Sequence, residues 1–362
     1  MTIPRLRDDA YAPLGRVHPR VSRAGFGCYR VDDREGVHRR ALAGALEAGV
    51  TLIDTSTNYA DGHSETLVGE VLADSVARDA VRREDIVVVT KIGYLQGGNL
   101  DEARRRVRAG RPWTEVVEYG PDLWHAISPD FLEDQLTASL GRLAMPRVDL
   151  LLLHNPEYFL THAVHAGIPR EEARAVFYDR TARAFGRLES EVAAGRIGAY
   201  GVSSNTLVVA RERADAVSLE RLLAGAGPGF AAVQLPFNPI ETGAREPIHT
   251  EDGRSVLDVA RASGLGVLVN RPFNAFSGRG LVRFADLPPD ALAELGRDAA
   301  WESARVRELQ AWVTSAFAGA APAAGSLAQR TLRALLATPG VDAVLAGMRR
   351  PEYVQDVVGA FV

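Results

Sequence analysis

The chain has 362 residues, of which 46% are hydrophobic and 24% are charged, with a formal net charge of -4 at pH 7. These are ordinary globular values, and the length allows two average domains or one α/β barrel with insertions. A net negative chain lacks the basic surface that nucleic acids and anionic membranes need, so we expect neither as a partner. One cysteine excludes an internal disulfide, and no apolar run reaches the roughly 18 residues of a membrane span. With no apolar leader after Met1, the sequence predicts a cytoplasmic protein.

Short runs of continuous apolar residues predict eight strands along the chain. They cover 25–30, 51–54, 86–91, 148–154, 197–203, 231–235, 266–271 and 341–346. Helical spacing of apolar residues predicts helices over 34–48, 64–72, 131–143, 171–195, 207–224, 254–263, 301–317, 326–337 and 351–362. Continuously apolar strands indicate a parallel sheet buried on both faces. Eight strand–helix units therefore predict the α/β fold class, as a (β/α)8 TIM barrel with one domain over 1–362.

Three connections are longer than ordinary strand-to-helix loops. Residues 93–128 are expected to form an insertion or lid after the third strand, and 155–170 and 272–298 are expected to be active-site loops. The first two of these connections contain five aromatic residues: Trp113, Tyr119, Trp124, Tyr158 and Phe159. These residues fit the lining of a substrate pocket, and they fit the anchoring of the loops to the barrel rim about equally well.

Four polar residues stand at or just past the ends of neighbouring predicted strands: Asp54, Tyr59, Lys91 and His154. Lys91 is the only lysine among 42 basic residues. Side chains at the carboxyl ends of barrel strands converge on one mouth. There, an ammonium held by a carboxylate is expected to lower the pKa of the phenol, and the histidine can orient a carbonyl or pass a proton. This set suits protonation of a carbonyl oxygen while a hydride is delivered.

The order Asp-(four residues)-Tyr, Lys, His resembles the aldo-keto reductase superfamily over almost the whole chain. The resemblance implies a catalytic tetrad of Asp54, Tyr59, Lys91 and His154, with Tyr59 as general acid and base. It also implies nicotinamide contacts from Ser204 and Asn205 in Gly201-Val-Ser-Ser-Asn205 and from Gln234 on the sixth strand. Further cofactor-binding positions implied by the alignment are Gly27, Cys28, Tyr29, Asn270, Arg271, Gly347, Arg349 and Arg350.

Arg349 and Arg350 offer two cations to the 2′-phosphate of NADP(H), which is therefore the favoured cofactor, with NAD(H) left open. The sequence departs from the family at Tyr353 and Val357, where Gln and Asn often contact the adenosine. It also has Asn270 or Arg271 in place of an aromatic residue at the end of the seventh strand.

The expected function is an NAD(P)H-dependent oxidoreductase acting on a small-molecule carbonyl or alcohol: an aldehyde, a ketone or a sugar lactol. The alternative is a nicotinamide-nucleotide-binding regulatory subunit with incidental turnover. A metal-dependent barrel hydrolase is disfavoured because Gly27-Cys28-Tyr29-Arg30 lacks a His-x-His pair. His162 and His165 have no third ligand nearby, so no metal is expected. The sequence leaves the substrate, the reaction direction and the oligomeric state open.

Overall fold

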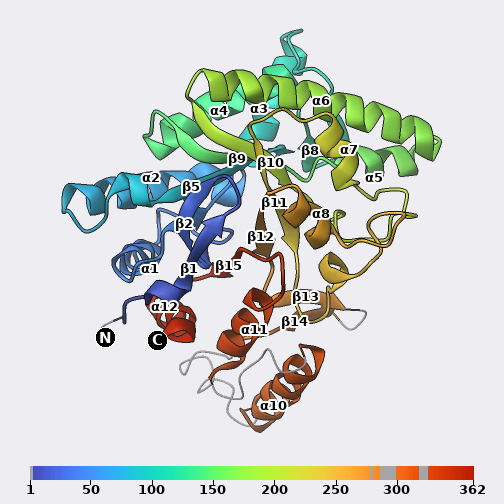
Figure 1. Cartoon of the computed structure of the whole chain (residues 1–362). Helices are drawn as coiled ribbons and strands as arrows, with labels where there is room; N and C mark the ends of the chain where they lie inside the picture. The colour runs from blue at the N-terminus through green and yellow to red at the C-terminus, as the bar shows by residue number, and fades with distance from the viewer. Residues whose placement is uncertain (1–2, 278–279, 286–298, 318–324) are drawn as a thin grey trace.

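A closed barrel of eight parallel strands forms the centre of the molecule in a computed structural model, which describes residues 3–277, 280–285, 299–317 and 325–362 (Figure 1). Around the barrel the strands follow the order β10-β11-β12-β15-β3-β4-β5-β9. Their bounds are β3 Ala24–Gly27, β4 Leu52–Asp54, β5 Val87–Ile92, β9 Val148–His154, β10 Ile197–Ser203, β11 Phe230–Pro236, β12 Gly266–Asn270 and β15 Ala343–Gly347. The predicted TIM barrel is confirmed.

Helices cover the outside of the barrel. They are α1 Gly36–Glu47, α2 His63–Ala77, α4 Pro129–Leu143, α6 Arg170–Ala193, α7 Leu219–Ala224, α8 Val256–Ala262, α11 Leu327–Leu336 and α12 Pro351–Val358. The extra helix α10 Ala299–Ala316 contacts α11 at one end of the molecule (Figure 1). Two of these helices begin with reciprocal capping boxes, at Ser255 and Ser326, which explains why their starts were readable from sequence.

One predicted helix is shorter than expected. The prediction covered 207–224, but only Leu219–Ala224 is helical. Ser218 is the N-cap, and its side chain accepts a hydrogen bond from the backbone N–H of Arg221. Because an N-cap residue has non-helical backbone angles, the helix starts there and the preceding residues form turns.

An N-terminal hairpin, β1 Tyr11–Leu14 and β2 His18–Ser22, was not predicted. Its Leu14 and Val21 are fully buried in the same cluster as the side chains inside the barrel. At Gly15, between the two strands, φ is +47°, and an added Cβ would lie 2.1 Å from the backbone nitrogen of Gly266. The hairpin therefore packs directly against the start of β12 and contributes to the barrel core.

The three long connections contain regular structure. Residues 93–128 hold β6 Tyr94–Leu95, α3 Gly97–Arg108, β7 Val117–Gly120 and β8 Leu123–His125, which form a three-stranded antiparallel sheet and one helix. The stretch 155–170 was expected to be a loop, but it contains α5 Tyr158–His165. Within 272–298, the strands β13 Asn274–Ser277 and β14 Gly280–Arg283 pair as a hairpin, and 278–279 and 286–298 lie outside the described residues.

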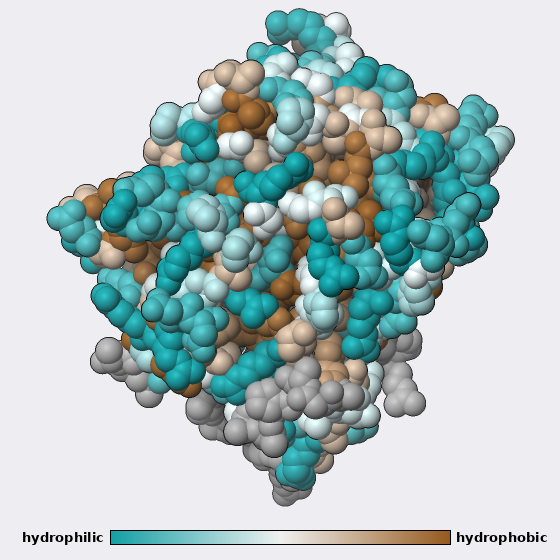
Figure 2. Space-filling view, in the orientation of Figure 1, coloured by the Kyte–Doolittle hydropathy of each residue, from teal (hydrophilic) through white to brown (hydrophobic). Residues whose placement is uncertain are grey.

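The face of the molecule in Figure 2 is mostly hydrophilic, with hydrophobic side chains in small separate areas. Among the described residues, no helix is both long enough and apolar enough to cross a bilayer.

Candidate active site

Three adjacent strands deliver the predicted tetrad to one end of the barrel. Asp54 ends β4, Lys91 lies one residue before the end of β5, and His154 ends β9. The loop after β4 then runs alongside the end of β5, because the backbone N–H groups of Thr55 and Thr57 donate to the carbonyls of Val89 and Lys91. This extension of the strand ladder holds the loop that leads to Tyr59.

The Lys91 ammonium makes three hydrogen bonds. Its Nζ lies 2.8 Å from Asp54 Oδ2, 2.8 Å from the carbonyl oxygen of Thr55 and 3.1 Å from Tyr59 Oη. An ammonium has three hydrogens and no acceptor, so these partners use its full capacity. Because Tyr59 Oη accepts from Lys91, the hydroxyl hydrogen of Tyr59 is free to point to another acceptor.

The backbone after Tyr59 is strained. Ala60 and Asp61 both have left-handed angles, with φ values of 48° and 55°, which cost a residue with a Cβ roughly 1 kcal/mol or more each. The carboxylate of Asp61 accepts from the backbone N–H of Gly98 at 3.0 Å, at the start of α3. The insertion therefore helps to hold the turn that positions Tyr59.

Burial sets the direction of the pKa shifts in the tetrad. It raises the pKa of the Asp54 carboxyl and lowers the pKa of the Lys91 ammonium, while their ion pair opposes both shifts. Burial, followed by the nearby Asp54 charge, raises the pKa of Tyr59 well above its ordinary value. The expectation of a lowered pKa for Tyr59 is therefore wrong, because desolvation of the phenolate and the nearby Asp54 charge raise it. Tyr59 is held as a phenol, which is the form of a proton donor.

His154 is neutral in this environment. Burial, then the charges of Lys91 and His125, lower the pKa of its imidazole well below the ordinary value. Its Nδ1 lies 3.0 Å from the hydroxyl of Ser56, and its ring meets the ring of Tyr59 edge-on at 5.9 Å between centroids. The second ring nitrogen, Nε2, has no hydrogen-bond partner among the described residues.

Gln234 contacts the tetrad directly. Its Nε2 donates to Asp54 Oδ1 at 2.8 Å, and its Oε1 accepts from Ser203 Oγ at 3.1 Å and from Asn270 Nδ2 at 3.3 Å. The resemblance implies a contact from Gln234 to the nicotinamide carboxamide, and this contact stays a prediction, since the amide nitrogen has a second hydrogen to donate. With its first hydrogen Gln234 orients the Asp54 carboxylate.

Two asparagine side chains, one in the turn after β10 and one at the end of β12, also fit a carboxamide. The half-buried side chain of Asn205 has no hydrogen-bond partner among the described residues, and the buried Oδ1 of Asn270 is an acceptor without one. The backbone N–H of Asn205 donates to Glu157 Oε1 at 2.7 Å, which fixes the turn. An amide that both donates and accepts could pair with these two side chains, so the residues present fit a nicotinamide.

The remaining predicted cofactor positions lie on the neighbouring strands and the loops that follow them. Gly27 and Gly347 are paired at the ends of β3 and β15. Arg349 is exposed between β15 and α12, and Arg350 is the half-buried N-cap of α12. Arg271 follows β12 with φ +53° and is held by an ion pair with Glu241 at 3.0 Å.

Cys28 and Tyr29 differ in accessibility. Cys28 is fully buried, and burial raises the pKa of its thiol, so it contributes backbone and packing rather than a reactive sulfur. Tyr29 is 67% exposed, and its ring meets the Tyr59 ring edge-on at 5.3 Å between centroids.

An aromatic cluster beside His154 was only partly foreseen. The Tyr94 ring lies 4.6 Å from the His154 ring, and its hydroxyl accepts from Asn155 Nδ2 at 2.6 Å. His125 stacks on Tyr158, and its Nε2 lies 2.7 Å from the carbonyl oxygen of His154. Sequence reasoning missed Tyr94 and His125 because both lie in the insertion. Tyr94 could have been found from its position three residues after Lys91, close to the end of the strand that carries Lys91.

Of the aromatic residues expected either to line a pocket or to anchor a loop, the structure gives one example of each position. Tyr119 joins the cluster through an edge-on contact with Tyr158 at 4.8 Å between ring centroids. Trp113 is an anchor, since its Nε1 donates to Asp134 at 2.8 Å and its ring packs on Phe131.

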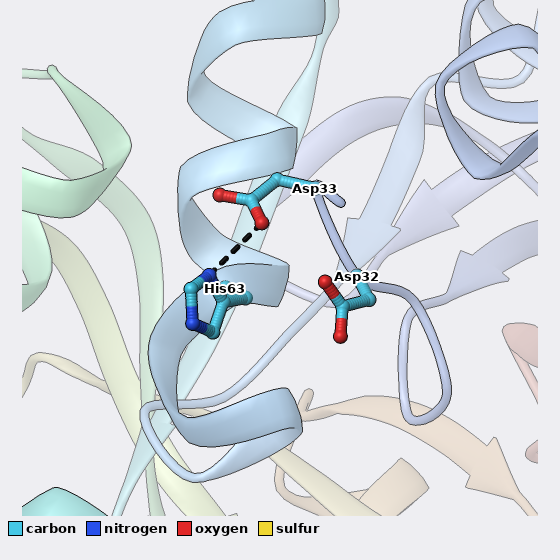
Figure 3. Close-up of side chains that lie close together, drawn as sticks. All are labelled: Asp32, Asp33 and His63. Atoms are coloured by element: carbon cyan, nitrogen blue, oxygen red, sulfur yellow. Dashed lines mark hydrogen bonds and ion pairs between the residues drawn. The ribbon is translucent and has the colours of Figure 1, made fainter. Parts of the chain in front are cut away.

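A second group of titratable side chains lies near the start of α2. Asp33 Oδ1 and His63 Nδ1 are 2.9 Å apart, and Asp32 lies beside them (Figure 3). One ligand atom from each of these three residues lies within 4.8 Å of the others. Asp32 is already paired with Arg34, which lowers the pKa of its carboxyl, and Asp33 is paired with His63, so each of the three side chains already has a protein partner.

Comparison with known proteins gives the family of the chain. The sequence model of the Aldo/keto reductase family matches residues 25–362. An NADH-specific methylglyoxal reductase from Escherichia coli is 28% identical over 39% of this chain and 40% of its own length. A 6-dehydroglucose reductase from Novosphingobium aromaticivorans is 28% identical over 54% of this chain and 52% of its own. The chain thus spans about half the length of these curated relatives or less.

The fold matches solved structures over more of the chain. An aldo-keto reductase from Bacillus halodurans, in its holo form, superposes with a TM-score of 0.59 at 22% identity, covering 97% of this chain and 90% of that one. With a family model that matches nearly every residue and this barrel around an Asp–Lys–Tyr–His site, the chain belongs to the aldo-keto reductase family.

Proposed function

We propose that this protein is a carbonyl reductase that uses a reduced nicotinamide nucleotide, with Tyr59 as the proton donor. The observation that carries the proposal is the hydrogen bond from Lys91 Nζ to Tyr59 Oη. Lys91 occupies the acceptor side of the hydroxyl, and the Tyr59 hydrogen is left for a carbonyl oxygen. A bound reduced nicotinamide would supply the hydride to the carbonyl carbon.

Each residue of the site has a separate task in this proposal. Tyr59 donates its proton to the developing alkoxide, and Lys91 stabilises the phenolate that is left. Asp54 keeps Lys91 charged and aimed, since its Oδ2 lies 2.8 Å from Nζ. His154 orients the carbonyl through Nε2. Asn205 and Asn270 would hold the carboxamide of the nicotinamide, and Arg349 with Arg350 would hold a 2′-phosphate.

Reduction is the direction to test first. Tyr59 is a phenol in this structure, since burial raises its pKa, and a phenol is the form that donates a proton to a carbonyl oxygen. The relatives named as reductases of methylglyoxal and of 6-dehydroglucose support small polar aldehydes and oxidised sugars as the first substrates to test.

The proposal is tested by measuring oxidation of NADPH and NADH with a panel of aldehydes, ketones and oxidised sugars. We expect Tyr59→Phe to lower kcat by about 10²–10⁴-fold, the usual contribution of a positioned general acid. Tyr11→Phe is the matched control, because Tyr11 also loses a hydroxyl that donates a hydrogen bond, to the carbonyl of Gly49 outside the site. Undiminished turnover by Tyr59→Phe contradicts the proposal. Tight nucleotide binding without turnover of any carbonyl would instead favour a regulatory binding subunit.

A further inference from the structure

Ser56 lies in the loop between Asp54 and Tyr59 and is fully buried. Its Oγ is 3.0 Å from His154 Nδ1, 2.7 Å from Asn58 Oδ1 and 3.2 Å from the carbonyl oxygen of Lys91. A hydroxyl has only one hydrogen to donate. The partner that receives this hydrogen therefore determines what Ser56 can do for His154.

A neutral imidazole carries one N–H, so the proton sits on either Nδ1 or Nε2. The groups around the ring are Lys91, Tyr59, His125 and Tyr94, and none of them makes a hydrogen bond to Nδ1 among the described residues. Ser56 is thus the group that Nδ1 pairs with. If Ser56 donates to Nδ1, Nε2 carries the proton and can donate to a carbonyl oxygen. If Nδ1 donates to Ser56, Nε2 is only an acceptor.

The hydrogen-bond chain continues away from His154. Asn58 Nδ2 donates to Gln96 Oε1 at 3.0 Å, and the half-buried Gln96 precedes α3 in the insertion. With the Asn58 oxygen toward Ser56, the serine hydrogen is drawn to Asn58. Rotating the two amides by half a turn would place the Asn58 NH2 toward Ser56, and the serine hydrogen would then go to Nδ1. The donor-to-acceptor direction of the hydrogen bonds between Ser56, Asn58 and Gln96 is therefore linked to the tautomer of His154.

We propose that Ser56 is a positioning residue that, together with Asn58 and Gln96, sets the tautomer and orientation of the His154 imidazole. The kinetic consequence rests on the carbonyl reduction proposed above, because that reaction needs a proton on Nε2 facing the carbonyl. The tautomer itself does not depend on turnover. The two can therefore be tested separately.

The test compares Ser56→Ala with Thr57→Val. Thr57 is the matched control, since its buried hydroxyl also donates to the carbonyl of Lys91, at 3.1 Å, but has no hydrogen bond to His154. Nitrogen NMR of protein labelled with ¹⁵N-histidine reports which ring nitrogen is protonated, and the His154 signals are those missing from His154→Gln. We expect one tautomer in the wild type and in Thr57→Val, and exchange between two tautomers in Ser56→Ala.

In kinetics, Ser56→Ala is expected to lower kcat/KM for the carbonyl about five- to tenfold, the value of one hydrogen bond, with an unchanged KM for the nucleotide. Unaltered His154 signals in Ser56→Ala overturn the proposal. Changes in Thr57→Val as large as those in Ser56→Ala also overturn it, because the two variants share only the loss of a hydrogen bond to the Lys91 carbonyl. If the wild type reduces no carbonyl, the proposed function fails and the spectra alone decide the role of Ser56.

Asn58→Asp provides a second variant that does not remove the serine. A carboxylate only accepts, so Ser56 must donate to it and Nδ1 of His154 must carry the proton. We expect the spectra of this variant to show a proton on Nδ1 and none on Nε2. A proton on Nε2 in Asn58→Asp contradicts the chain of hydrogen bonds.

Discussion

Gln234 Nε2 donates to Asp54 Oδ1 at 2.8 Å, although the two residues lie on opposite strands of the barrel. In the closed order of eight strands, β11 and β4 are four positions apart in either direction. The hydrogen bond therefore crosses the interior near the barrel mouth. With Lys91 on its other oxygen, the Asp54 carboxylate is held from two sides.

Replacing Gln234 with methionine leaves Asp54 Oδ1 buried without its donor. We expect Gln234→Met to lower the free energy of unfolding by about 1–3 kcal/mol, the cost of an unsatisfied buried polar group. Denaturant unfolding measures this loss. Gln135→Met on α4 is the control, because the Gln135 side chain is also buried but its Oε1 has no partner to lose. Equal losses in the two variants would mean that the bond to Asp54 contributes nothing specific.

The ion pair of Asp54 and Lys91 predicts non-additive effects on stability. Lys91→Met should cost about 3–5 kcal/mol, because the buried Asp54 carboxylate loses its counter-charge. Adding Asp54→Asn should recover part of this loss, since the double variant buries no charge. Unfolding of the two single variants and the double variant gives the coupling free energy. Simple additivity would contradict an interacting pair.

Glu157 predicts a pH-dependent stability. Burial raises the pKa of its carboxyl to about 7, above the ordinary 4.5. Between these values the unfolded carboxyl has lost its proton and the folded one has kept it, so the contribution to stability falls as pH rises. We expect wild type to lose about 3 kcal/mol relative to Glu157→Gln between about pH 4.5 and about pH 8, because each pKa unit is worth about 1.4 kcal/mol.

Denaturant unfolding of both proteins across this range measures the difference, and the other titrating groups cancel in it. A constant difference between wild type and Glu157→Gln would show that Glu157 ionises at its ordinary pKa in the folded protein.

The choice of cofactor is tested at Arg349, which is exposed after β15. We expect Arg349→Ala to weaken NADPH binding about tenfold or more and to leave NADH binding unchanged, because an arginine–phosphate hydrogen bond acts only on the 2′-phosphate. Titrations followed by intrinsic fluorescence measure both affinities. Arg111→Ala, an exposed arginine in the insertion, controls for net charge. Equal affinity for the two nucleotides in wild type would mean that Arg349 binds no 2′-phosphate.

The local pattern of the sequence was sufficient to predict the barrel. Strands such as Val148–His154 are continuously apolar because both faces are buried, and they alternate with helices whose spacing and caps are readable. The N-terminal hairpin was missed because its burial depends on contact with β12, far away in the chain. The helix in 155–170 was missed because eight residues give a weak periodic signal.

The sequence by itself determined the family and the ends of the two strands that carry Asp54 and His154, and it placed Lys91 within one residue of the end of its strand. The tertiary structure decided their electrostatics, since burial rather than the Lys91 charge controls the pKa of Tyr59. It also decided the partners of Gln234 and Ser56, which come from strands and loops distant in the chain. Desolvation and hydrogen-bond geometry depend on the position of every neighbouring atom, and residue order does not specify those positions locally.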